Sequence, residues 1–385
     1  MRILWAFIGF LSVFILSLSD AQSAQLHPDL VRVRLMTAGK KIKVSGVGLK
    51  FQSLSQAIQQ VSIPMNNQAE IRLLQKDGKN FWGLKINSQD YEHLFAEKYF
   101  VIQGESMRIG TQTLPDKVLL SSSGSSKVDV VGVLPLDEYV IGVLSSEMPS
   151  SWPLETLKAQ AVAIRSYTLA VMSERKDRAY HVESSVMDQV FRHVLGDEEA
   201  ELKLKKAIQA VKETEGMKLI GPDRHVLKAF YHSDCGGRTT TAKNVWQGGV
   251  DAGVAVDSSC PTGPHSIWNF KISKENMAKR LNVASFTSMV LVKSKADNRV
   301  QEVRVALNDG TSKSFSANEF RQILGFQELR STAFDLKVEA GQLLFNGKGF
   351  GHGVGLCQWG SRVLGTRGAT FKEILTHYYP LARLK

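Results

Sequence analysis

The chain has 385 residues, of which 43% are hydrophobic and 22% charged, and its formal net charge is +11. This composition is that of an ordinary globular protein, and the length allows one large domain or two to three smaller ones. A basic surface attracts polyanions: nucleic acid, anionic lipid or an anionic cell-wall polymer. The sequence has no RNP-like motif, zinc-finger spacing or arginine-rich arm, so nothing in it favours nucleic acid.

The first 24 residues predict export. Arg2 provides a positive start, residues 3–18 are apolar, and the small residues at 21–24 allow cleavage after Ser23 or Ala24. This pattern is typical of a signal peptide, and a retained N-terminal anchor is the alternative. No later stretch is long and apolar enough to span a bilayer. We therefore expect an exported protein of the periplasm or cell wall, with no stable membrane span after the signal is removed.

Residues 25–125 predict a small N-terminal β-rich region. Residues 31–36 and 41–51 alternate between apolar and polar positions and are rich in Val and Ile, as strands are. Further short strands follow, separated by Gly, Asn, Asp and Ser, and a weak helix is an alternative over 53–61. This region carries no obvious chemistry.

A helical stretch follows, and its centre is a glutamate at a forced break. Residues 136–144 predict a helix that starts after Pro135, and Pro149 predicts extended backbone just after Glu147. A second helix starts at Pro153. Its expected buried stripe is Leu154, Leu157, Ala161, Ile164, Thr168 and Val171. Glu147 then lies at a junction between two helices, where a solvated charge or a cap is the simplest interpretation.

The remaining elements predict an α+β fold. A further helix is expected over 197–215, mixed β-rich support over 271–345, and a last helix that opens with a capping box, Thr370 to Glu373. The fold class is a helical catalytic core with antiparallel β regions plus the N-terminal β-rich region. The predicted domains are 25–125 and 126–385.

The segment HSDCGG at 232–237 allows two interpretations. In an oxidising compartment two of the three cysteines can pair, and Cys235 and Cys260 lie in the same loop-rich region, so we expect a Cys235–Cys260 disulfide. Alternatively, His232 and Cys235 are half of a zinc site that Cys260 and His265 complete, although the spacing matches no standard zinc module. We predict no metal or other cofactor, with zinc as the alternative.

Residues 347–360, GKGFGHGVGLCQWG, predict a loop where the backbone turns tightly or touches a ligand. It is not a phosphate loop, because no Gly-Lys-Ser/Thr follows. His352 and Cys357 are compatible with a thiol nucleophile and its base, whereas Gln358 and Trp359 suggest a sugar-binding surface. A plain structural turn is the remaining alternative.

Three separated motifs resemble one known family. They are PLDEYVIGVLSSEMPSSWPLETLKAQAVAIRSYTL, FYHSDCGGRTTTAKNVW and GKGFGHGVGLCQWGSRVLGTRGATFKEILTHYYP. The chain resembles the SpoIID/LytB superfamily of sporulation stage II protein D, a peptidoglycan lytic transglycosylase, and the amidase-enhancer proteins. The resemblance covers roughly residues 125–380.

The resemblance implies a catalytic acid at Glu147. The positions that it places in substrate binding are Arg165, Tyr167, Gln189, His232, Ser233, Gly236, Gly237, His352, Gly353, Gln358, Trp359 and Tyr378. Some members carry zinc near the HS-CGG loop with additional Cys and His, whereas Asp234 stands here where a His would strengthen that case. Cys357 stands where the family usually has Ser, which argues against a nucleophilic thiol.

Two functions from different classes follow. The first is a lytic transglycosylase that cleaves the MurNAc–GlcNAc bond of glycan strands and leaves 1,6-anhydro-MurNAc ends, with one carboxyl acting as acid and then as base. The second is a non-catalytic cell-wall-binding protein that activates or recruits an amidase. A cysteine peptidase built on Cys357 and His352 is the weakest alternative. The expected partners are peptidoglycan glycan strands and a cell-wall amidase.

Overall fold

The structure is a computed structural model, and it describes residues 30–53, 60–62, 68–86, 93–95, 99–124, 126–185, 187–194, 198–246, 248–257, 263 and 266–385. The predicted signal peptide lies outside the described residues. The chain divides into two compact units, one formed by Met1–Leu30 and Thr37–Val130 and the other by Val31–Met36 and Val131–Lys385. Each is described by itself below.

The first unit is built on antiparallel strands. Five longer strands lie in the order β9-β7-β2-β4-β5, and three short strands pair at their sides. Alternation decides which face is buried, because Ile42 and Val44 of β2 are buried and Lys41 and Lys43 are exposed. The strands of this unit are β2 (Lys41–Ser53), β3 (Gln60–Ser62), β4 (Gln68–Lys76), β5 (Lys79–Ile86), β6 (His93–Phe95), β7 (Tyr99–Ile109), β8 (Gln112–Thr113) and β9 (Lys117–Ser123).

Two strands are shared between the units, β1 (Leu30–Gly39) and β10 (Lys127–Pro135). In the second unit β1 pairs in parallel with β11 (Val182–Glu183) through Val33 and Val182. The strands predicted at 31–36 and 41–51 are confirmed. The alternative helix over 53–61 is wrong where it can be judged, because Ser53 and Gln60 are in strands; residues 54–59 lie outside the described residues.

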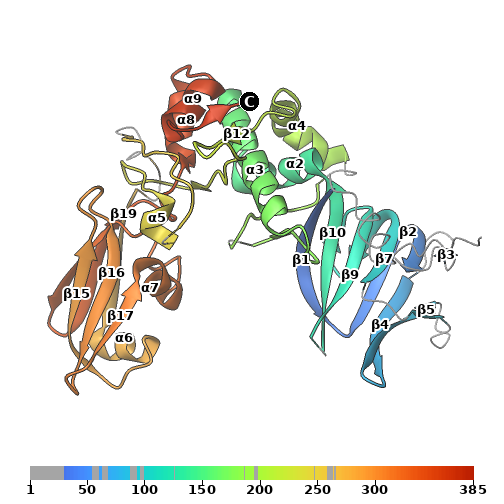
Figure 1. Ribbon diagram of the computed structural model, residues 1–385, viewed down its shortest axis with the longest axis horizontal. Coiled ribbons are helices and arrows are strands. Elements are labelled where there is room, and N and C mark those ends of the chain that lie inside the picture. The colour runs from blue at the N-terminus through green and yellow to red at the C-terminus, as the bar shows by residue number, and fades with distance from the viewer. Residues whose placement is uncertain are drawn as a thin grey trace, which may run out of the picture. The chain divides into compact units, whose positions relative to one another are not determined.

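The second unit contains a helical core around one central helix (Figure 1). α3 (Leu154–Glu174) packs against α2 (Leu136–Glu147), α4 (Glu198–Lys212), α8 (Gln358–Thr366) and α9 (Phe371–Tyr378). The helix boundaries follow the prolines, because Pro135 and Pro153 occupy the N-cap positions of α2 and α3. Met148, before Pro149, is extended at φ −132° and ψ 138°, as expected from its neighbour.

The other predicted helical features agree with the structure. Of the expected stripe on α3, Leu157, Ala161, Ile164, Thr168 and Val171 are buried. The helix expected over 197–215 is α4, and the capping box that opens α9 is present, with Thr370 and Glu373 bonding each other's backbone.

A second hydrophobic core lies within the second unit. It packs aromatic side chains such as Phe320, Phe334 and Phe345 between two antiparallel sheets and two helices. One sheet has the order β14-β19-β18 and the other β15-β16-β17. Its elements are β14 (Ile267–Ser273), α6 (Lys274–Arg280), β15 (Phe286–Lys293), β16 (Val300–Leu307), β17 (Ser312–Ser316), α7 (Ala317–Leu324), β18 (Phe334–Glu339) and β19 (Gln342–Lys348).

Short elements connect the two cores and complete the unit. They are β12 (Leu219–Ile220) paired with β21 (Arg383–Leu384), β13 (Tyr231–His232) paired with β20 (Leu356–Cys357), and α5 (Ala242–Trp246). The predicted α+β class, with helices, antiparallel strands and an N-terminal β-rich region, is confirmed. Within the described residues, no helix combines the length and the apolar character that crossing a membrane requires.

Candidate active site

Glu147 is the last residue of α2, at the break that Pro149 imposes. Its Oε1 accepts a hydrogen bond from the backbone N–H of Val190 at 3.3 Å. Burial raises the pKa of the Glu147 carboxyl, and the N–H of Val190 and the side chain of Gln358 oppose that rise because they favour the charged form. A carboxyl with a raised pKa retains its proton at higher pH and can act as a general acid.

The segment beside Glu147 is held in place by a buried amide. Gln189 Oε1 accepts hydrogen bonds from Tyr139 Oη at 3.1 Å and from Thr168 Oγ1 at 3.0 Å. Tyr139 belongs to α2 and Thr168 to α3, so Gln189 fixes its own segment against both helices. Because Val190 follows directly, this anchoring sets the position of the N–H that Glu147 accepts.

A second carboxylate, Asp188, lies in the same segment but is fully engaged. Its Oδ1 accepts from Tyr167 Oη at 3.0 Å and from Arg175 Nη2 at 3.1 Å, and its Oδ2 from Arg175 Nη1 at 2.7 Å and from the N–H of Glu183 at 3.0 Å. The charge and hydrogen bond of Asp188, together with burial, raise the pKa of the Tyr167 phenol far above its usual range. Asp188 is therefore a fixed structural anion rather than a carboxylate that is available to a substrate.

Polar atoms without partners gather around the helical core. Within the part of the chain that the structure describes, both amide atoms of Gln160, the amide nitrogens of Gln189 and Gln358, and Tyr231 Oη are buried and accept or donate no hydrogen bond of normal geometry. Glu147 raises the pKa of Tyr231, after burial, so that phenol lies close to the carboxylate. Unpaired buried polar groups each cost about 1–3 kcal/mol. Such groups, together with a carboxyl whose pKa is raised, suit a hydroxyl-rich ligand.

The two glycine-containing motifs meet through the short strand pair β13 and β20, in which His232 lies opposite Cys357. His352 lies in a cluster of rings, with centroids 5.4 Å from His232, 5.0 Å from Trp246 and 5.9 Å from Phe230. Its Nδ1 accepts from the N–H of Val354 at 3.0 Å. Burial, followed by the charges of His232 and Arg321, lowers the pKa of His352 well below its usual value, so its ring is neutral.

Two glycines in these motifs are required by close approach. Gly236 has φ +68°, and a Cβ there would meet Lys348 at 2.9 Å. Gly353 has φ +83°, and a Cβ there would meet the Arg299 guanidinium at 2.7 Å. Gly237, also at positive φ, accepts at its carbonyl from the N–H of Asp257 at 2.9 Å. These glycines shape the loops, and the conformation explains them without a ligand.

A pocket of about 690 Å³ adjoins this region. Aromatic rings line part of it, because Tyr167, Phe230 and Trp246 all contribute, and Phe230 stacks on Trp246 with ring centroids 4.5 Å apart. Charged side chains line the rest, among them Lys228, whose Nζ is 2.7 Å from Glu174. Asp188 also lines the pocket and is two residues from Val190, which joins the pocket wall to Glu147.

Not all predicted site residues lie where a substrate can reach them. Arg165 is buried within the core, where it donates to Asp137 Oδ1 at 2.8 Å and to the carbonyl of Thr214 at 2.8 Å, so it connects helices rather than binding substrate. Tyr378 is also completely buried, and its Oη donates to Asp257 Oδ2 at 2.5 Å. The substrate-binding roles predicted for these two residues are not supported by their positions.

The remaining predicted residues lie near the two loops. Gln358 begins α8 beside Glu147, and the backbone N–H of Trp359 donates to the carbonyl of Ser233 at 3.1 Å. The Trp359 ring meets Trp152 edge-on with centroids 5.2 Å apart, and Arg362 lies 4.9 Å above it. Trp359 therefore packs within the protein on at least one side.

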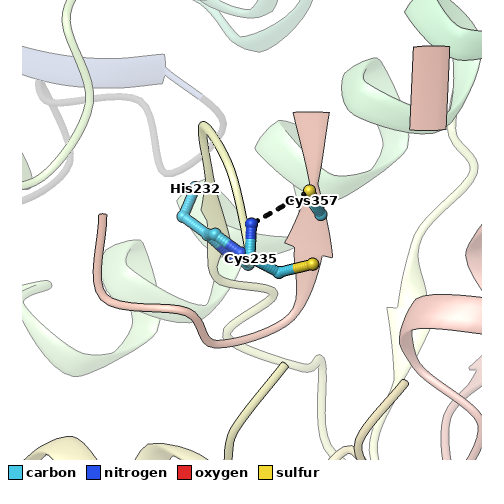
Figure 2. A group of neighbouring side chains, drawn as sticks. All are labelled: His232, Cys235 and Cys357. Atoms are coloured by element: carbon cyan, nitrogen blue, oxygen red, sulfur yellow. Dashed lines mark hydrogen bonds between the residues drawn. The ribbon is translucent and has the colours of Figure 1, made fainter. Parts of the chain in front are cut away.

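The cysteines form an unexpected arrangement. Cys235 and Cys357 carry buried thiols, and His232, Cys235 and Cys357 have donor atoms that all lie within 4.8 Å of one another (Figure 2). One imidazole and two thiols are a donor set that fits a soft divalent metal. Cys260 and His265 lie outside the described residues, so the Cys235–Cys260 disulfide and the zinc site completed by Cys260 and His265 stay predictions.

Several residues were missed by sequence reasoning. Val190 and Tyr231 lie beside Glu147, and Asp257 holds the buried Tyr378 in place. Tyr231 directly precedes His232, and Val190 directly follows Gln189, so the motif neighbours were a usable signal for both. Asp257 offered none, because only the fold brings it to Tyr378.

Comparison with known proteins finds two matching family models and several relatives. The family model "Stage II sporulation protein" matches residues 124–220, and a model described as "Domain of unknown function (DUF8618)" matches residues 268–355. "Stage II sporulation protein D" of Bacillus amyloliquefaciens is 30% identical over 263 residues, which cover 64% of this chain and 73% of that protein.

Two proteins of Bacillus subtilis (strain 168) are also similar. Its "Stage II sporulation protein D" is 29% identical over 262 residues, covering 64% of this chain and 73% of that protein. Its "Amidase enhancer" is 25% identical over 289 residues, covering 62% of this chain but 39% of that protein. The family model over residues 124–220 contains the helical junction, and the matches cover 73% of each of the two sporulation proteins. The chain therefore belongs to the SpoIID family of stage II sporulation proteins.

Proposed function

We propose that this protein is a peptidoglycan lytic transglycosylase in which Glu147 is the catalytic acid and base. The observation that carries the proposal is the asymmetry between two neighbouring carboxyl groups. Glu147 has a raised pKa and a single backbone donor at normal distance, whereas Asp188 has donors on both oxygens. A hydrolase of the common two-carboxylate type needs a second carboxylate that can act as nucleophile or base. A lytic transglycosylase needs only one.

The single carboxyl group of Glu147 accounts for both proton transfers of the reaction. Protonated Glu147 gives its proton to the glycosidic oxygen as the bond from C1 of MurNAc to that oxygen breaks. The resulting carboxylate then takes the proton from the 6-hydroxyl of the same MurNAc while that oxygen bonds to C1. The product is a 1,6-anhydro-MurNAc end, no water is consumed, and Glu147 returns to its protonated form. The N–H of Val190 and the amide of Gln358 stabilise the carboxylate between the two steps.

The pocket whose wall includes Asp188, two residues from the Val190 that contacts Glu147, suits a sugar ring of the same strand. Trp246, with 39% of its surface exposed, and Phe230 offer aromatic faces on which a pyranose packs, and the charged rim offers groups for hydroxyls. Trp246→Ala should raise KM about tenfold, equivalent to ~1.4 kcal/mol of binding, with little change in kcat. A fall in kcat with unchanged KM would mean that Trp246 is not part of a binding subsite.

The compartment is part of the same proposal. The N-terminal pattern of a signal peptide and the net charge of +11 suit an exported protein that works on an anionic wall. Peptidoglycan glycan strands would then be both the substrate and the binding partner.

The test is product analysis on purified wall sacculi and glycan strands. We expect soluble products that end in 1,6-anhydro-MurNAc and take up no oxygen from ¹⁸O-labelled water. Reducing-end MurNAc carrying one labelled oxygen would replace this proposal with a hydrolase. Glu147→Gln should bind the strands but release almost nothing, because Gln cannot give or take the proton. Glu138→Gln, on the first turn of the same helix, is the matched control and should keep its activity.

A second candidate is an accessory role, favoured by the printed name of one relative. The B. subtilis protein called "Amidase enhancer" covers 62% of this chain. In that case the protein would bind the wall, release no product by itself, and raise the rate of an added cell-wall amidase. Wild-type protein and Glu147→Gln would then stimulate the amidase equally, whereas the enzyme proposal expects Glu147→Gln to be inactive in every assay of glycan cleavage.

A further inference from the structure

Arg362 packs on two tryptophan rings close to the candidate active site. Its guanidinium carbon is 5.4 Å from the centroid of the Trp152 ring and 4.9 Å from that of the Trp359 ring. The two rings meet edge-on, with their centroids 5.2 Å apart. Guanidinium carbons at such distances make cation–π contacts, which hold the side chain in one place. The position of the Arg362 charge is therefore set by aromatic packing before any ligand binds.

Both tryptophans belong to segments that reach the Glu147 carboxyl. Trp152 follows Glu147 by five residues, in the turn between α2 and α3. Trp359 directly follows Gln358, whose side chain contacts Glu147. Arg362 comes four residues after Gln358 on α8, and residues four apart on a helix are neighbours on one face, with Cβ atoms about 5–6 Å apart. Arg362 thus lies one helical turn from a residue that contacts the carboxyl.

The charge of Arg362 is not paired within the described part of the chain. The residue is half-buried, and no carboxylate of a described residue forms a salt bridge with it. Arg165, by contrast, pairs with Asp137 at 2.8 Å. Packing on rings forms no hydrogen bond, so the N–H donors of the Arg362 fork stay available. A carboxylate can accept two such donors in parallel.

We infer that Arg362 is a specificity-determining residue that binds a carboxylate of the glycan strand. MurNAc carries a free lactyl carboxylate where no stem peptide is attached, and the carboxylates of the peptide where one is. Either group is a planar acceptor that matches the guanidinium fork. A bound strand then contacts Glu147 at its glycosidic oxygen and Arg362 at its carboxylate. This role rests on the proposed function, because it takes peptidoglycan strands as the ligand.

The test measures strand binding by Glu147→Gln protein, so that no strand is cleaved during a titration. Three forms of one strand preparation are compared: strands freed of stem peptides, the same peptide-free strands with their lactyl carboxyls converted to neutral methylamides, and strands that keep their stem peptides. The neutral strands isolate the contribution of the carboxylate, because they retain the sugars and the length. An ionic strength of about 0.15 M limits long-range attraction between the basic protein and the anionic strands.

One of the two carboxylate-bearing forms should bind Glu147→Gln protein about 10- to 100-fold more tightly than the neutral strands, as expected for hydrogen bonds between charged groups. Tighter binding of the peptide-free strands assigns the contact to the lactyl carboxylate, and tighter binding of the peptide-bearing strands assigns it to the peptide. Adding Arg362→Gln should lower the affinity for the preferred form to that for the neutral strands. Adding Arg362→Lys, which keeps the charge but not the planar fork, should restore part of the preference.

Arg367→Gln, also added to Glu147→Gln protein, is the matched control. Arg367 is the exposed C-cap residue of the same helix, and its substitution removes the same charge. This variant should keep the full preference for the carboxylate-bearing form.

Equal affinity of Glu147→Gln protein for all three forms, or binding of none, would overturn the role of Arg362. That comparison needs no Arg362 variant, so it decides the question even if Arg362→Gln does not fold. A preference that persists in folded Arg362→Gln protein would also overturn it. Failure of the proposed function has a different signature: wild-type protein would release no 1,6-anhydro-MurNAc ends, while the carboxylate preference and its loss in Arg362→Gln would remain.

Discussion

The two hydrophobic cores of the second unit bury polar groups in different ways. The core around α3 buries several polar atoms that form no hydrogen bond of normal geometry among the described residues, including both amide atoms of Gln160 and the amide nitrogen of Gln189. In the described part of the core at 267–348, Trp268 Nε1 is one such atom, whereas Arg321 donates to the carbonyls of Leu329 at 2.9 Å and Arg330 at 2.7 Å. A protein tolerates unpaired buried polar groups mainly where function requires them. The difference supports our proposal that the helical core carries the site and the other core supports it.

The two cores are nevertheless connected, and one of the connections is the side chain of Arg299. Arg299 belongs to the segment before β16, and its Nη2 donates to the carbonyls of Cys235 at 2.6 Å and Arg238 at 2.9 Å. These carbonyls lie in the loop that carries His232. The supporting core thereby fixes the backbone of a loop that packs in the helical core.

The largest expected effect is on the rate of glycan cleavage, and it should differ between a glutamate of the helical core and one of the supporting core. Glu147→Gln should lower the rate of glycan cleavage by about 10²–10⁴-fold, because it removes general acid–base catalysis. Glu302→Gln, at a half-buried position of β16 in the supporting core, should leave the rate unchanged. Initial rates of muropeptide release by equal amounts of folded protein give the measurement. Equal rates for wild-type protein and Glu147→Gln would remove catalysis from the helical core.

The next effect is on stability and concerns the aromatic packing of the supporting core. Phe345 is completely buried and meets Phe320 and Phe334 with ring centroids 6.2 and 5.7 Å away. Phe345→Ala should lower the free energy of unfolding by about 3–5 kcal/mol, because it leaves a cavity. Val338→Ala, at a position that is 53% exposed, should change it by less than about 0.5 kcal/mol.

The Phe345→Ala variant also tests whether the supporting core affects stability alone or the rate of glycan cleavage as well. At a temperature where Phe345→Ala is still folded, its rate of glycan cleavage per folded molecule should be near that of wild-type protein. Denaturant titrations and rates measured on the same samples decide the question. A loss of rate without a loss of folded protein would show that the supporting core takes part directly in the site.

A smaller effect is expected at the connection between the cores. Arg299→Ala removes two hydrogen bonds from a charged donor to buried carbonyls, and each such bond contributes about 1.5–3 kcal/mol. Both bonds start from the same nitrogen, so their contributions do not simply add, and we expect a loss of about 2–4 kcal/mol in stability. We also expect a lower kcat, because the loop at 232–237 loses its anchor. Arg304→Ala removes only an exposed pair with Glu302 and should cost less than about 1 kcal/mol. An unchanged kcat for folded Arg299→Ala would mean that this connection contributes to stability but not to the reaction.

The smallest effect concerns pH. Because the pKa of Glu147 is raised in the folded protein, the native state binds its proton more tightly than the unfolded chain does. The stability that this tighter proton binding provides is fully present below the unfolded pKa and is lost as pH rises through the folded pKa. For each pH unit by which the folded pKa exceeds the unfolded pKa, about 1.4 kcal/mol of this stability is lost on going to neutral pH.

Glu147→Gln removes this pH dependence, so its stability relative to wild-type protein should increase as pH rises from the unfolded pKa of Glu147 through its folded pKa. The cleavage rate of wild-type protein should fall as pH rises through the same pKa, because the acid is then ionised. Urea titrations at a series of pH values measure the first effect, and pH–rate profiles of kcat/KM the second. A relative stability of the variant that is constant with pH would mean that Glu147 has an ordinary pKa.

Local features of the fold could be predicted from the sequence alone. Pro135, Pro149 and Pro153 set where α2 ends and α3 begins, because proline restricts its own φ and the conformation of the residue before it. Alternation in residues 41–51 specified a strand, and Thr370 and Glu373 specified a capped helix. These are interactions within a few residues of the chain, and short-range chemistry determines them.

The assembly of the site could be predicted only in part. The sequence and its motifs pointed to Glu147 and to the two glycine-containing loops. It did not distinguish Gln358, which lies against Glu147, from Arg165, which is consumed by internal hydrogen bonds to Asp137 and Thr214. Both are polar residues in matching motifs, and only the packing of α3 against its neighbours decides which of them faces the site.

The sequence by itself thus determined the elements, the break at Glu147 and the loops that could accept a ligand. Tertiary structure alone decided the pairing of His232 with Cys357, the ion pair of Asp188 with Arg175 and its hydrogen bond from Tyr167, and the raised pKa of Glu147. The physical reason is that pKa values and ligand sets depend on burial and on distances between side chains far apart in the chain, and no local pattern encodes those distances.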